Sequence, residues 1–402
     1  MKELLWGTRQ EPEGPEEEGP GLNGSAHNEP APRPRPFIAL DAFHPLAAPE
    51  ADGTMDLRAF ISALEDAGRL VRIRERVDWK LGIGRWTRAR RKALLFEDIK
   101  GYPGQRVFTN GLIGQHGIAI ALGFDPRTPM PELIADTRKR LRQPIRPRLV
   151  ITGPVMENVL PASVIDLLEF PVPQWSKFDA GRYIGTWHLN ISRDPQTGER
   201  NIGVYRMQVL EAKRATISAS PNSDLGRHVA RAEAKEKELP VAVAIGAPEV
   251  TVIAGGAACP KGMDEFELAG ALQHKPVDLI QCGHLEVPAH SEIVIEGFIH
   301  PGVRVQDGPY FDYYGRPSTN PKAFLFEATR VMHRDNPIFR GTAIGKPGAE
   351  DHQLFAFLAQ LGLVDFHGSR LKQMVQNYLW KRRSFETLQK VGQMGSRMRN
   401  RE

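Results

Sequence analysis

The sequence predicts an α+β fold, with helical segments at both ends and a β-rich centre. Apolar residues follow helical spacing just after residue 54, and a helical pattern returns from Glu350. Between them, β-branched and aromatic runs bounded by Gly, Pro and Asn dominate residues 148–330. The chain has 402 residues, 41% of them hydrophobic and 25% charged, which is enough for two or three domains with a sizeable core.

The composition and the N-terminal residues also indicate in which compartment the protein is found. The longest apolar stretch, Val241–Ala258, is broken by Pro248 and Glu249, so we expect no membrane span. The first residues turn acidic and Pro-rich at once, which is unlike a secretory signal. Two cysteines, Cys259 and Cys282, fit a reducing compartment and lack metal-type spacing. We therefore expect a cytoplasmic protein.

The net charge of +5 is unevenly distributed. Residues 1–54 carry 4 Lys/Arg against 10 Asp/Glu, a net charge of −6, which leaves +11 for the other residues. A pI near 9.1 permits nucleic-acid binding, but the basic stretches lack zinc-finger spacing and an RNP-like aromatic motif. We expect no nucleic-acid partner. A solvated surface or a site for an anionic ligand explains the basic residues better.

The first 54 residues predict a disordered tail rich in Pro and Gly. This tail is either a mis-called start or a real disordered arm. An ordered domain begins at Met55, and Asp56 is placed to cap a helix. The apolar residues of that helix are Leu57, Phe60, Ile61 and Leu64.

The remaining segments predict three regions in chain order. Residues 55–147 form an N-terminal α/β region, residues 148–345 a central β domain, and residues 346–402 a basic helical tail. Strand-like runs of the first region are Leu70–Ile73, Ala93–Glu97 and Arg106–Thr109, followed by a helix over 129–143. Those of the second include Gly185–Ser192, Val204–Leu210, Ala215–Ala219, Val241–Ile245, Val250–Ala254, Ile293–Phe298 and Phe324–Met332. Its predicted helices are Gly226–Glu238 and Glu265–Gln273.

General motifs exclude several common sites. No Gly-x-Gly-x-x-Gly follows a strand, so a Rossmann dinucleotide site is not predicted. Gly345-Lys346 is followed by Pro347, and the required first glycine is Arg340, so this is no P-loop. Neither His-Glu-x-x-His nor Gly-x-Ser-x-Gly occurs.

One segment reads as a β-hairpin with an unusual charge. Asp194–Gly198 predicts the turn, and Asn201–Gln208 the returning strand. On that strand Arg206 shares a face with Ile202 and Val204. Either this face lines a cavity where the guanidinium meets an anion, or a β-bulge returns Arg206 to solvent.

Several blocks in the same order resemble the UbiD-type decarboxylases, which use prenylated FMN. The resemblance extends from Asp56 to Glu350 and includes the opening Asp-Leu-Arg-x-Phe helix. It implies that residues 148–345 form a flavin-binding split β-barrel-like domain. The other blocks are Leu94–Tyr102, Asp194–Gln208, Gly262–Ala271, Val287–Gly297 and Asp307–Asp312.

The resemblance implies a cofactor site along the strand that carries Arg206. Asn201 and Glu265 fall on the family's ligands for a divalent metal, usually manganese, with potassium as a second ion. Ser223 stands where the family has a histidine ligand, so weaker metal binding is expected. For Glu265 the alternative is an ordinary first-turn helix acid. The implied cofactor-binding residues are Asn201, Ile202, Gly203, Val204, Tyr205, Arg206, Asn222, Ser223 and Glu265.

The resemblance also implies a catalytic trio of Arg206, Asp307 and Asp312. Arg206 would orient the substrate carboxylate, Asp307 would pair with Arg206, and Asp312 would donate the proton. The alternative is that Asp307-Gly-Pro is an ordinary turn whose two acids have no function.

The implied activity is the reversible, non-oxidative decarboxylation of an aromatic or α,β-unsaturated acid. A ubiquinone-pathway 4-hydroxybenzoate and simple phenolic acids are the implied substrates, and a flavin prenyltransferase would supply the cofactor. A homo-oligomer or a multi-subunit complex is expected. Compared with the family, the C-terminus is shortened; together with Ser223 this favours, as the first alternative, a non-catalytic subunit or inactive homologue. A nucleic-acid-associated basic protein is the second alternative.

Overall fold

The largest sheet of the protein is antiparallel and has seven strands. The computed structural model describes residues 53–364, apart from 186, 260–261 and 346–348. The strand order is β10-β15-β14-β11-β7-β8, and β5 pairs with β15 outside that path. The strands are β5 (Asn158–Pro161), β7 (His188–Arg193), β8 (Arg200–Gly203), β10 (Arg214–Ile217), β11 (Leu239–Ile245), β14 (Ile293–Phe311) and β15 (Pro317–His333).

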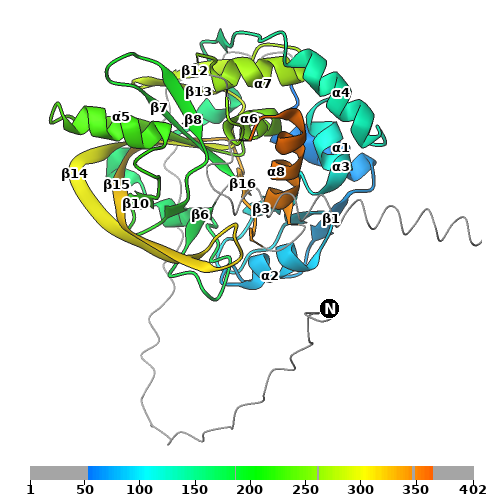
Figure 1. Cartoon of the computed structure of the whole chain (residues 1–402). Helices are drawn as coiled ribbons and strands as arrows, with labels where there is room; N and C mark the ends of the chain where they lie inside the picture. The colour runs from blue at the N-terminus through cyan, green and yellow to red at the C-terminus, as the bar shows by residue number, and fades with distance from the viewer. Residues whose placement is uncertain (1–52, 186, 260–261, 346–348, 365–402) are drawn as a thin grey trace, which may run out of the picture. The chain divides into compact units, whose positions relative to one another are not determined.

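The two longest strands, β14 and β15, form one hairpin that bends strongly (Figure 1). They contain 19 and 17 residues. Two of the register shifts in their pairing flank Asp307, one between Val305 and Asp307 and one between Asp307 and Tyr310. Such irregularities increase local twist and re-aim side chains. Asp307 therefore lies at a bend of the strand and not in a regular ladder.

A second sheet, of four strands, combines segments that are far apart in the sequence. Its order is β1-β2-β3-β16, and β16 reaches it only after the long hairpin. The predicted first helix is confirmed, because Asp56 Oδ1 accepts a hydrogen bond from the amide of Ala59 at 2.8 Å and the four predicted apolar residues are buried. The elements are β1 (Leu70–Ile73), β2 (Ala93–Phe96), β3 (Arg106–Thr109), β16 (Ile338–Arg340), α1 (Leu57–Asp66), α2 (Gly82–Ala89), α3 (Gly114–Ala121) and α4 (Met130–Arg140).

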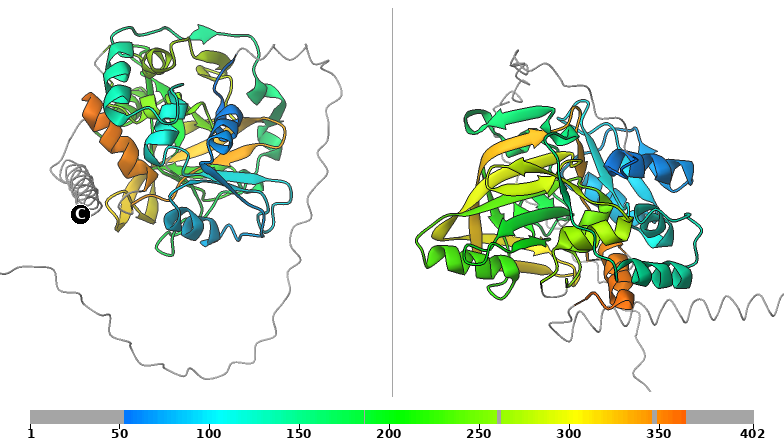
Figure 2. Two further views of the ribbon diagram at one scale, coloured as in Figure 1. Left: turned by 90° about the vertical axis from the view of Figure 1, so that its right-hand side faces the viewer. Right: turned by 90° about the horizontal axis from the view of Figure 1, so that it is seen from above.

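The remaining elements are shorter strands and four further helices. Among them α8 lies beside α4, where Nη2 of Arg138 donates to the main-chain oxygen of Gln360 at 2.6 Å (Figure 2). The strands are β4 (Arg148–Leu149), β6 (Tyr183–Gly185), β9 (Met207–Gln208), β12 (Asp278–Cys282) and β13 (Leu285–Pro288). The helices are α5 (Asp224–Glu233), α6 (Glu249–Gly255), α7 (Glu265–Gln273) and α8 (Glu350–Leu361), with 3-10 turns at Pro154–Met156, Ala162–Val164 and Leu167–Glu169.

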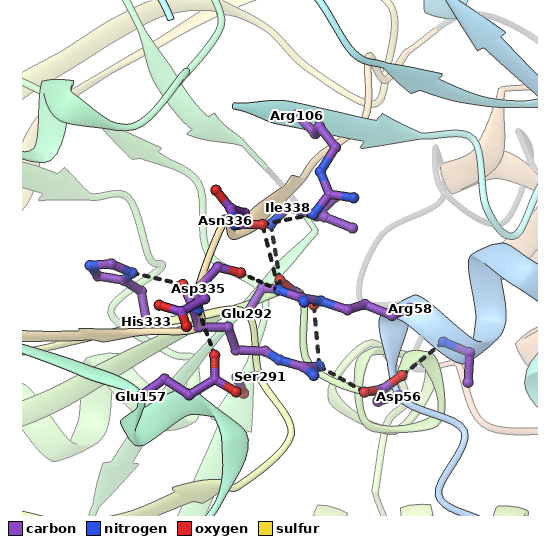
Figure 3. Close-up of polar contacts among 12 residues, drawn as sticks. Asp56, Arg58, Arg106, Glu157, Ser291, Glu292, His333, Asp335, Asn336 and Ile338 are labelled. Atoms are coloured by element: carbon purple, nitrogen blue, oxygen red, sulfur yellow. Dashed lines mark hydrogen bonds and ion pairs between the residues drawn. The ribbon is translucent and has the colours of Figure 1, made fainter. Parts of the chain in front are cut away.

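A buried carboxylate, Glu292, joins α1 to the start of β14 (Figure 3). Nε and Nη2 of Arg58 donate to its two oxygens at 2.8 and 2.9 Å. The amide of Ile338 donates to it at 3.0 Å, and Arg334 lies 3.4 Å away while also pairing with Asp56 at 2.7 Å. This network fixes the first helix against the segments on either side of the long hairpin.

Arg340 on β16 is fully buried between two carboxylates. Its Nε donates to Glu249 at 2.6 Å and its Nη2 to Glu350 at 2.5 Å. Glu350 also accepts from the amide of Leu112 at 2.6 Å, and Glu249 from Nε1 of Trp187 at 3.3 Å. Burial raises the pKa of Glu249, against the attraction of Arg340. The trio joins α6, β16 and the first turn of α8.

The predicted strand Val250–Ala254 is wrong, because these residues belong to α6. Every one of them is buried. A short apolar run that is buried on all sides has no polar face, so periodicity cannot separate a helix from a strand there. The distinguishing signal is local: Pro248 precedes the helix and Glu249 occupies its first turn.

The predicted returning strand Asn201–Gln208 is interrupted. Pairing with β7 ends at Gly203, and the chain pairs again only where Arg206 bridges to Ser218. Simple alternation across Val204 and Tyr205 is therefore wrong. The predicted helix Gly226–Glu238 is also displaced, since α5 begins two residues earlier and ends at Glu233.

The mixed α and β class predicted for the chain is confirmed. Within the described ranges, no helix is long and apolar enough to cross a membrane. Residues 1–52 and 365–402 of the predicted tails lie outside the described residues. The three predicted region boundaries stay predictions.

Candidate active site

Arg206 and Asp307 form a buried ion pair on one side of the bent hairpin. Nε and Nη2 of Arg206 each lie 2.5 Å from Oδ1 of Asp307. Nη1 of Arg206 donates to the hydroxyl of Ser318 at 2.7 Å, and the guanidinium lies 5.3 Å from the ring centre of Tyr310. The Asp307 side chain is inaccessible, and that of Arg206 is 12% exposed. Arg206 therefore meets an anion inside the fold instead of returning to solvent.

The second carboxylate oxygen of Asp307 is also bound. Oγ1 of Thr216, on β10, donates to Oδ2 of Asp307 at 2.5 Å. Burial raises the pKa of Asp307, while the charge of Arg206 and the Thr216 hydroxyl act in the opposite direction. Asp307 therefore accepts a proton more readily than a solvated aspartate does. Thr216 was not predicted, because nothing in a lone strand threonine distinguishes it from an ordinary β residue.

Asp312 lies in the tight turn after β14. Its Oδ1 accepts hydrogen bonds from the amides of Tyr314 at 2.9 Å and Arg316 at 3.4 Å, and its own amide donates to the Arg316 oxygen. The side chain is mostly buried. Over the described residues, Asp312 makes no hydrogen bond with Arg206 or Asp307. The structure thus brings together two of the three predicted catalytic residues and places the third in the adjacent turn.

The first turn of α8 contacts the main chain of the Asp312 turn and of Gly345 next to it. Nε2 of His352 lies 3.1 Å from the main-chain oxygen of Tyr313, and Asp351 Oδ2 accepts from the amide of Gly345 at 3.2 Å. Gly345 has a φ of +86°, and a Cβ there would lie 2.2 Å from the oxygen of Asp312. Burial raises the pKa of Asp351 to about 6. None of these residues was predicted from the sequence. The available signal was the run of three polar residues, 350–352, at the start of an otherwise apolar helix.

The predicted cofactor-binding residues gather where β8, α5 and α7 begin or end. Oε2 of Glu265 accepts from the amide of Ile202 at 3.3 Å. Burial raises the pKa of the Tyr205 phenol, which lies close to the side chains of Asn201 and Ser223. A Cβ at Gly203 would lie 2.5 Å from the Tyr205 ring, so only glycine permits this packing. Asn201, Tyr205, Ser223 and Glu265 therefore share one neighbourhood.

Three members of the predicted set, Ser223 among them, have structural roles. Ser223 caps α5, accepting from the amide of Gly226 at 3.1 Å and donating to the oxygen of Ser220 at 2.6 Å. The amide of Asn222 donates to the Ser220 hydroxyl. Val204 packs at the edge of the hydrophobic core. Ser223 is thus occupied where the family pattern leads us to expect a metal ligand.

The side chains near Asn201 offer some, but not all, of the oxygen ligands that a hard cation needs. Within the described ranges, no group of three His, Cys, Asp or Glu side chains is placed to hold a metal ion. Asn201 is 5% exposed and its Nδ2 lacks a hydrogen-bond partner among the described residues. Burial, with Asp264 adding repulsion, raises the pKa of Glu265 to about 7. The amide oxygen of Asn201 and the carboxylate of Glu265, which has no positive charge beside it among the described residues to offset its burial, would fit a divalent cation. The other ligands of that cation would come from a phosphate and water.

A cavity of about 250 Å³ lies elsewhere on the molecule. It is lined by the β7–β8 turn, the residues after α5 and the start of β13, including Lys235 and His284. None of the predicted site residues lines it.

Comparison with known proteins assigns the family. Residues 61–137 match the N-terminal domain of 3-octaprenyl-4-hydroxybenzoate carboxy-lyases, and residues 148–347 match their Rift-related domain. A solved UbiD-class enzyme from Pelotomaculum thermopropionicum, an evolved dimeric form of HmfF in complex with prFMN, shares 32% identity over 76% of this chain and 71% of its own, with a TM-score of 0.70. The chain belongs to the UbiD family.

Other UbiD relatives have named activities. The phenolic acid decarboxylase of Bacillus subtilis is 32% identical over 310 residues, which are 73% of this chain and 65% of the relative. The pyrrole-2-carboxylic acid decarboxylase of Pseudomonas aeruginosa is 31% identical, over 77% of this chain and 66% of the relative. The vanillic acid decarboxylase of Sedimentibacter hydroxybenzoicus, in closed form, superposes with a TM-score of 0.73 at 31% identity, over 76% of this chain and 67% of its own. The chain thus spans about two thirds of the length of these UbiD proteins.

Proposed function

We propose that this chain catalyses the reversible, non-oxidative decarboxylation of an aromatic or α,β-unsaturated acid with prenylated FMN. The observation that carries the proposal is the buried Arg206–Asp307 pair next to the Asn201–Tyr205 segment, in a member of the UbiD family. The named relatives decarboxylate phenolic and pyrrole acids, so these are the first substrates to test. A ubiquinone-pathway 4-hydroxybenzoate belongs to the same chemical class.

The cofactor would supply what no side chain can. Bound prenylated FMN acts as a sink for the charge that departing CO₂ leaves on an sp² carbon. The segment Asn201–Arg206, with Asn222, Ser223 and Glu265, would bind the flavin phosphate and chain. Asn201 and Glu265 would hold a manganese ion, with potassium as a second ion, and the cation would lower the pKa of Glu265. The occupied Ser223 hydroxyl predicts weaker metal binding than a histidine would give.

The protein's own groups would divide the remaining work. Arg206 carries the positive charge that orients the substrate carboxylate, and Asp307 with Ser318 holds its guanidinium in one direction. Asp312 would give a proton to the carbon that loses CO₂. Its Oδ1 is bound to two amides of its own turn, which leaves Oδ2 as the atom for the proton.

Partners follow from this chemistry. A flavin prenyltransferase would supply the cofactor, and the chain would act as a homo-oligomer or within a multi-subunit complex. The second candidate is a non-catalytic subunit or inactive homologue. The capping role of Ser223 favours it, because the residue at the position of the family's histidine ligand is already engaged in hydrogen bonds that cap α5.

The test is to co-express the full chain with a flavin prenyltransferase and to analyse the bound ligand. Absorbance and mass spectrometry of the released ligand should give prenylated FMN, with stoichiometric manganese by elemental analysis. Phenolic and pyrrole acids are then screened for CO₂ release, with Arg206→Ala and Asp312→Asn as inactive controls. A folded, colourless and metal-free protein would overturn the proposal and favour the non-catalytic subunit.

A further inference from the structure

Arg206 has little capacity left to recognise an incoming acid. Its Nε and Nη2 bind Asp307, its Nη1 binds the Ser318 hydroxyl, and Nη2 also lies 3.4 Å from the Ser318 main-chain oxygen. A further carboxylate must displace one of these contacts or be recognised first by another cation. The residues around the Asp312 turn contain such a cation.

Arg88, from α2, extends toward the end of β14, which carries Tyr310 and Phe311 and precedes the Asp312 turn. Its Nη1 donates to the main-chain oxygen of Trp175 at 2.5 Å, and its guanidinium lies 5.5 Å from the ring centre of Phe311. Over the described residues it makes no ion pair within 4.0 Å. Burial lowers the pKa of Arg88, while Tyr310, Asp179 and Asp351 attract it only at longer range. A partly buried guanidinium with one neutral acceptor has donors to spare and gains from binding an anion.

Asp179 does not supply that anion. Its Oδ2 accepts from the amide of Ser176 at 2.7 Å and its Oδ1 from the amide of Phe311 at 2.8 Å. Both carboxylate oxygens of Asp179 therefore accept hydrogen bonds from main-chain amides, and neither is paired with Arg88.

The surroundings of Arg88 suit an aromatic ligand. Phe311 stacks on Phe178 with ring centres 5.7 Å apart and planes inclined by 19°. Phe178 is 44% exposed, so the ring pair extends from the partly buried guanidinium to the surface. Lys177 lies over the other end of the pair, 5.2 Å from the ring centre of Phe178. A flat apolar surface flanked by cations matches an aryl group with a carboxylate attached.

We infer that Arg88 and the Phe178–Phe311 pair form a recognition point for aryl carboxylates beside the Asp312 turn. Arg88 would bind the carboxylate of the incoming acid first, and Arg206 would then orient it for the loss of CO₂. The inference rests on the proposed function for the identity of the acid. Arg88 would then set the substrate preference and the KM. It lies on α2, in the N-terminal region, where none of the predicted site residues lies.

The experiment measures equilibrium binding of benzoate and of neutral benzamide to the flavin-loaded protein by calorimetry. Arg88→Gln should weaken benzoate binding by about tenfold or more and leave benzamide binding within about twofold, because only the carboxylate uses the charge. Arg85→Gln, an exposed arginine on the same helix, is the matched control and should change neither. If Arg88→Gln does not fold, Arg88→Lys keeps the charge and should weaken benzoate binding by about three- to tenfold.

Unchanged benzoate affinity in folded Arg88→Gln or Arg88→Lys would overturn the inference. An equal loss of benzamide binding would also overturn the inference. So would the loss of bound flavin, because the anion that Arg88 binds would then be the cofactor phosphate. In steady-state assays Arg88→Gln should raise KM and preserve kcat. A protein without turnover whose benzoate binding depends on Arg88 would contradict the proposed function alone. Turnover with an Arg88-independent benzoate affinity would contradict the inference alone.

Discussion

Asp307 holds the Nε of Arg206 at 2.5 Å, although the two residues are 101 positions apart in the chain. The carboxylate fixes the direction of the guanidinium, and Thr216 fixes the carboxylate. The bend in β14 makes this possible, because register shifts on both sides of Asp307 turn it out of the regular ladder.

Replacing Asp307 by asparagine should lower kcat about 100-fold while leaving the fold intact. The amide keeps the size of the side chain but loses the charge that directs Arg206. The measurement is CO₂ release by protein with a verified content of prenylated FMN. Thr216→Val, which leaves the carboxylate in place, is the control and should cost about tenfold or less. Near-wild-type turnover in Asp307→Asn would show that the pair is structural only.

The contact between His352 and the Tyr313 oxygen predicts that α8 positions Asp312. His352→Phe keeps an aromatic ring but removes the hydrogen bond, so the turn should lose its fixed orientation. We expect kcat to fall about tenfold with little change in KM. Gln360→Ala, at the other end of α8, removes no contact to the turn and should be silent. Equal losses in both variants would point to general destabilisation of the helix.

Local signals predicted much of the fold. Asp56 caps α1 as predicted, and α7 has the predicted ends at Glu265 and Gln273. Failures occurred where local patterns are ambiguous, as in the buried helix α6, or where tertiary contacts decide, as at the break after Gly203. The contact of Arg88 could not have been predicted, because its partner Trp175 lies 87 residues away. For His352 the polar run 350–352 was a signal, but it did not indicate the contact with Tyr313, 39 residues away.

The Glu292 network predicts a large effect on stability. Glu292→Gln should lower the free energy of unfolding by about 3 kcal/mol, because Arg58 and Arg334 lose a buried counter-charge. Urea unfolding measures this directly. Glu327→Gln, which breaks a more exposed pair between β15 and Arg214 of β10, is the control and should cost about 0.5 kcal/mol. Similar values for the two variants would contradict a special role for Glu292.

Asp179 predicts how stability depends on pH. Burial raises its pKa from 3.8 to about 6, although the hydrogen bonds that it accepts from the amides of Ser176 and Phe311 act in the opposite direction. The folded state therefore binds the proton more tightly than the unfolded state. Its stabilising effect is complete below pH 3.8 and is lost as the pH rises through about 6, with an upper value of about 3 kcal/mol. Asp179→Asn removes this titration and adds a penalty that is independent of pH, since an amide has one oxygen to serve two donors. The wild-type advantage over Asp179→Asn should thus shrink between pH 4.5 and 7 in urea unfolding, and a constant difference would show that the group does not titrate there.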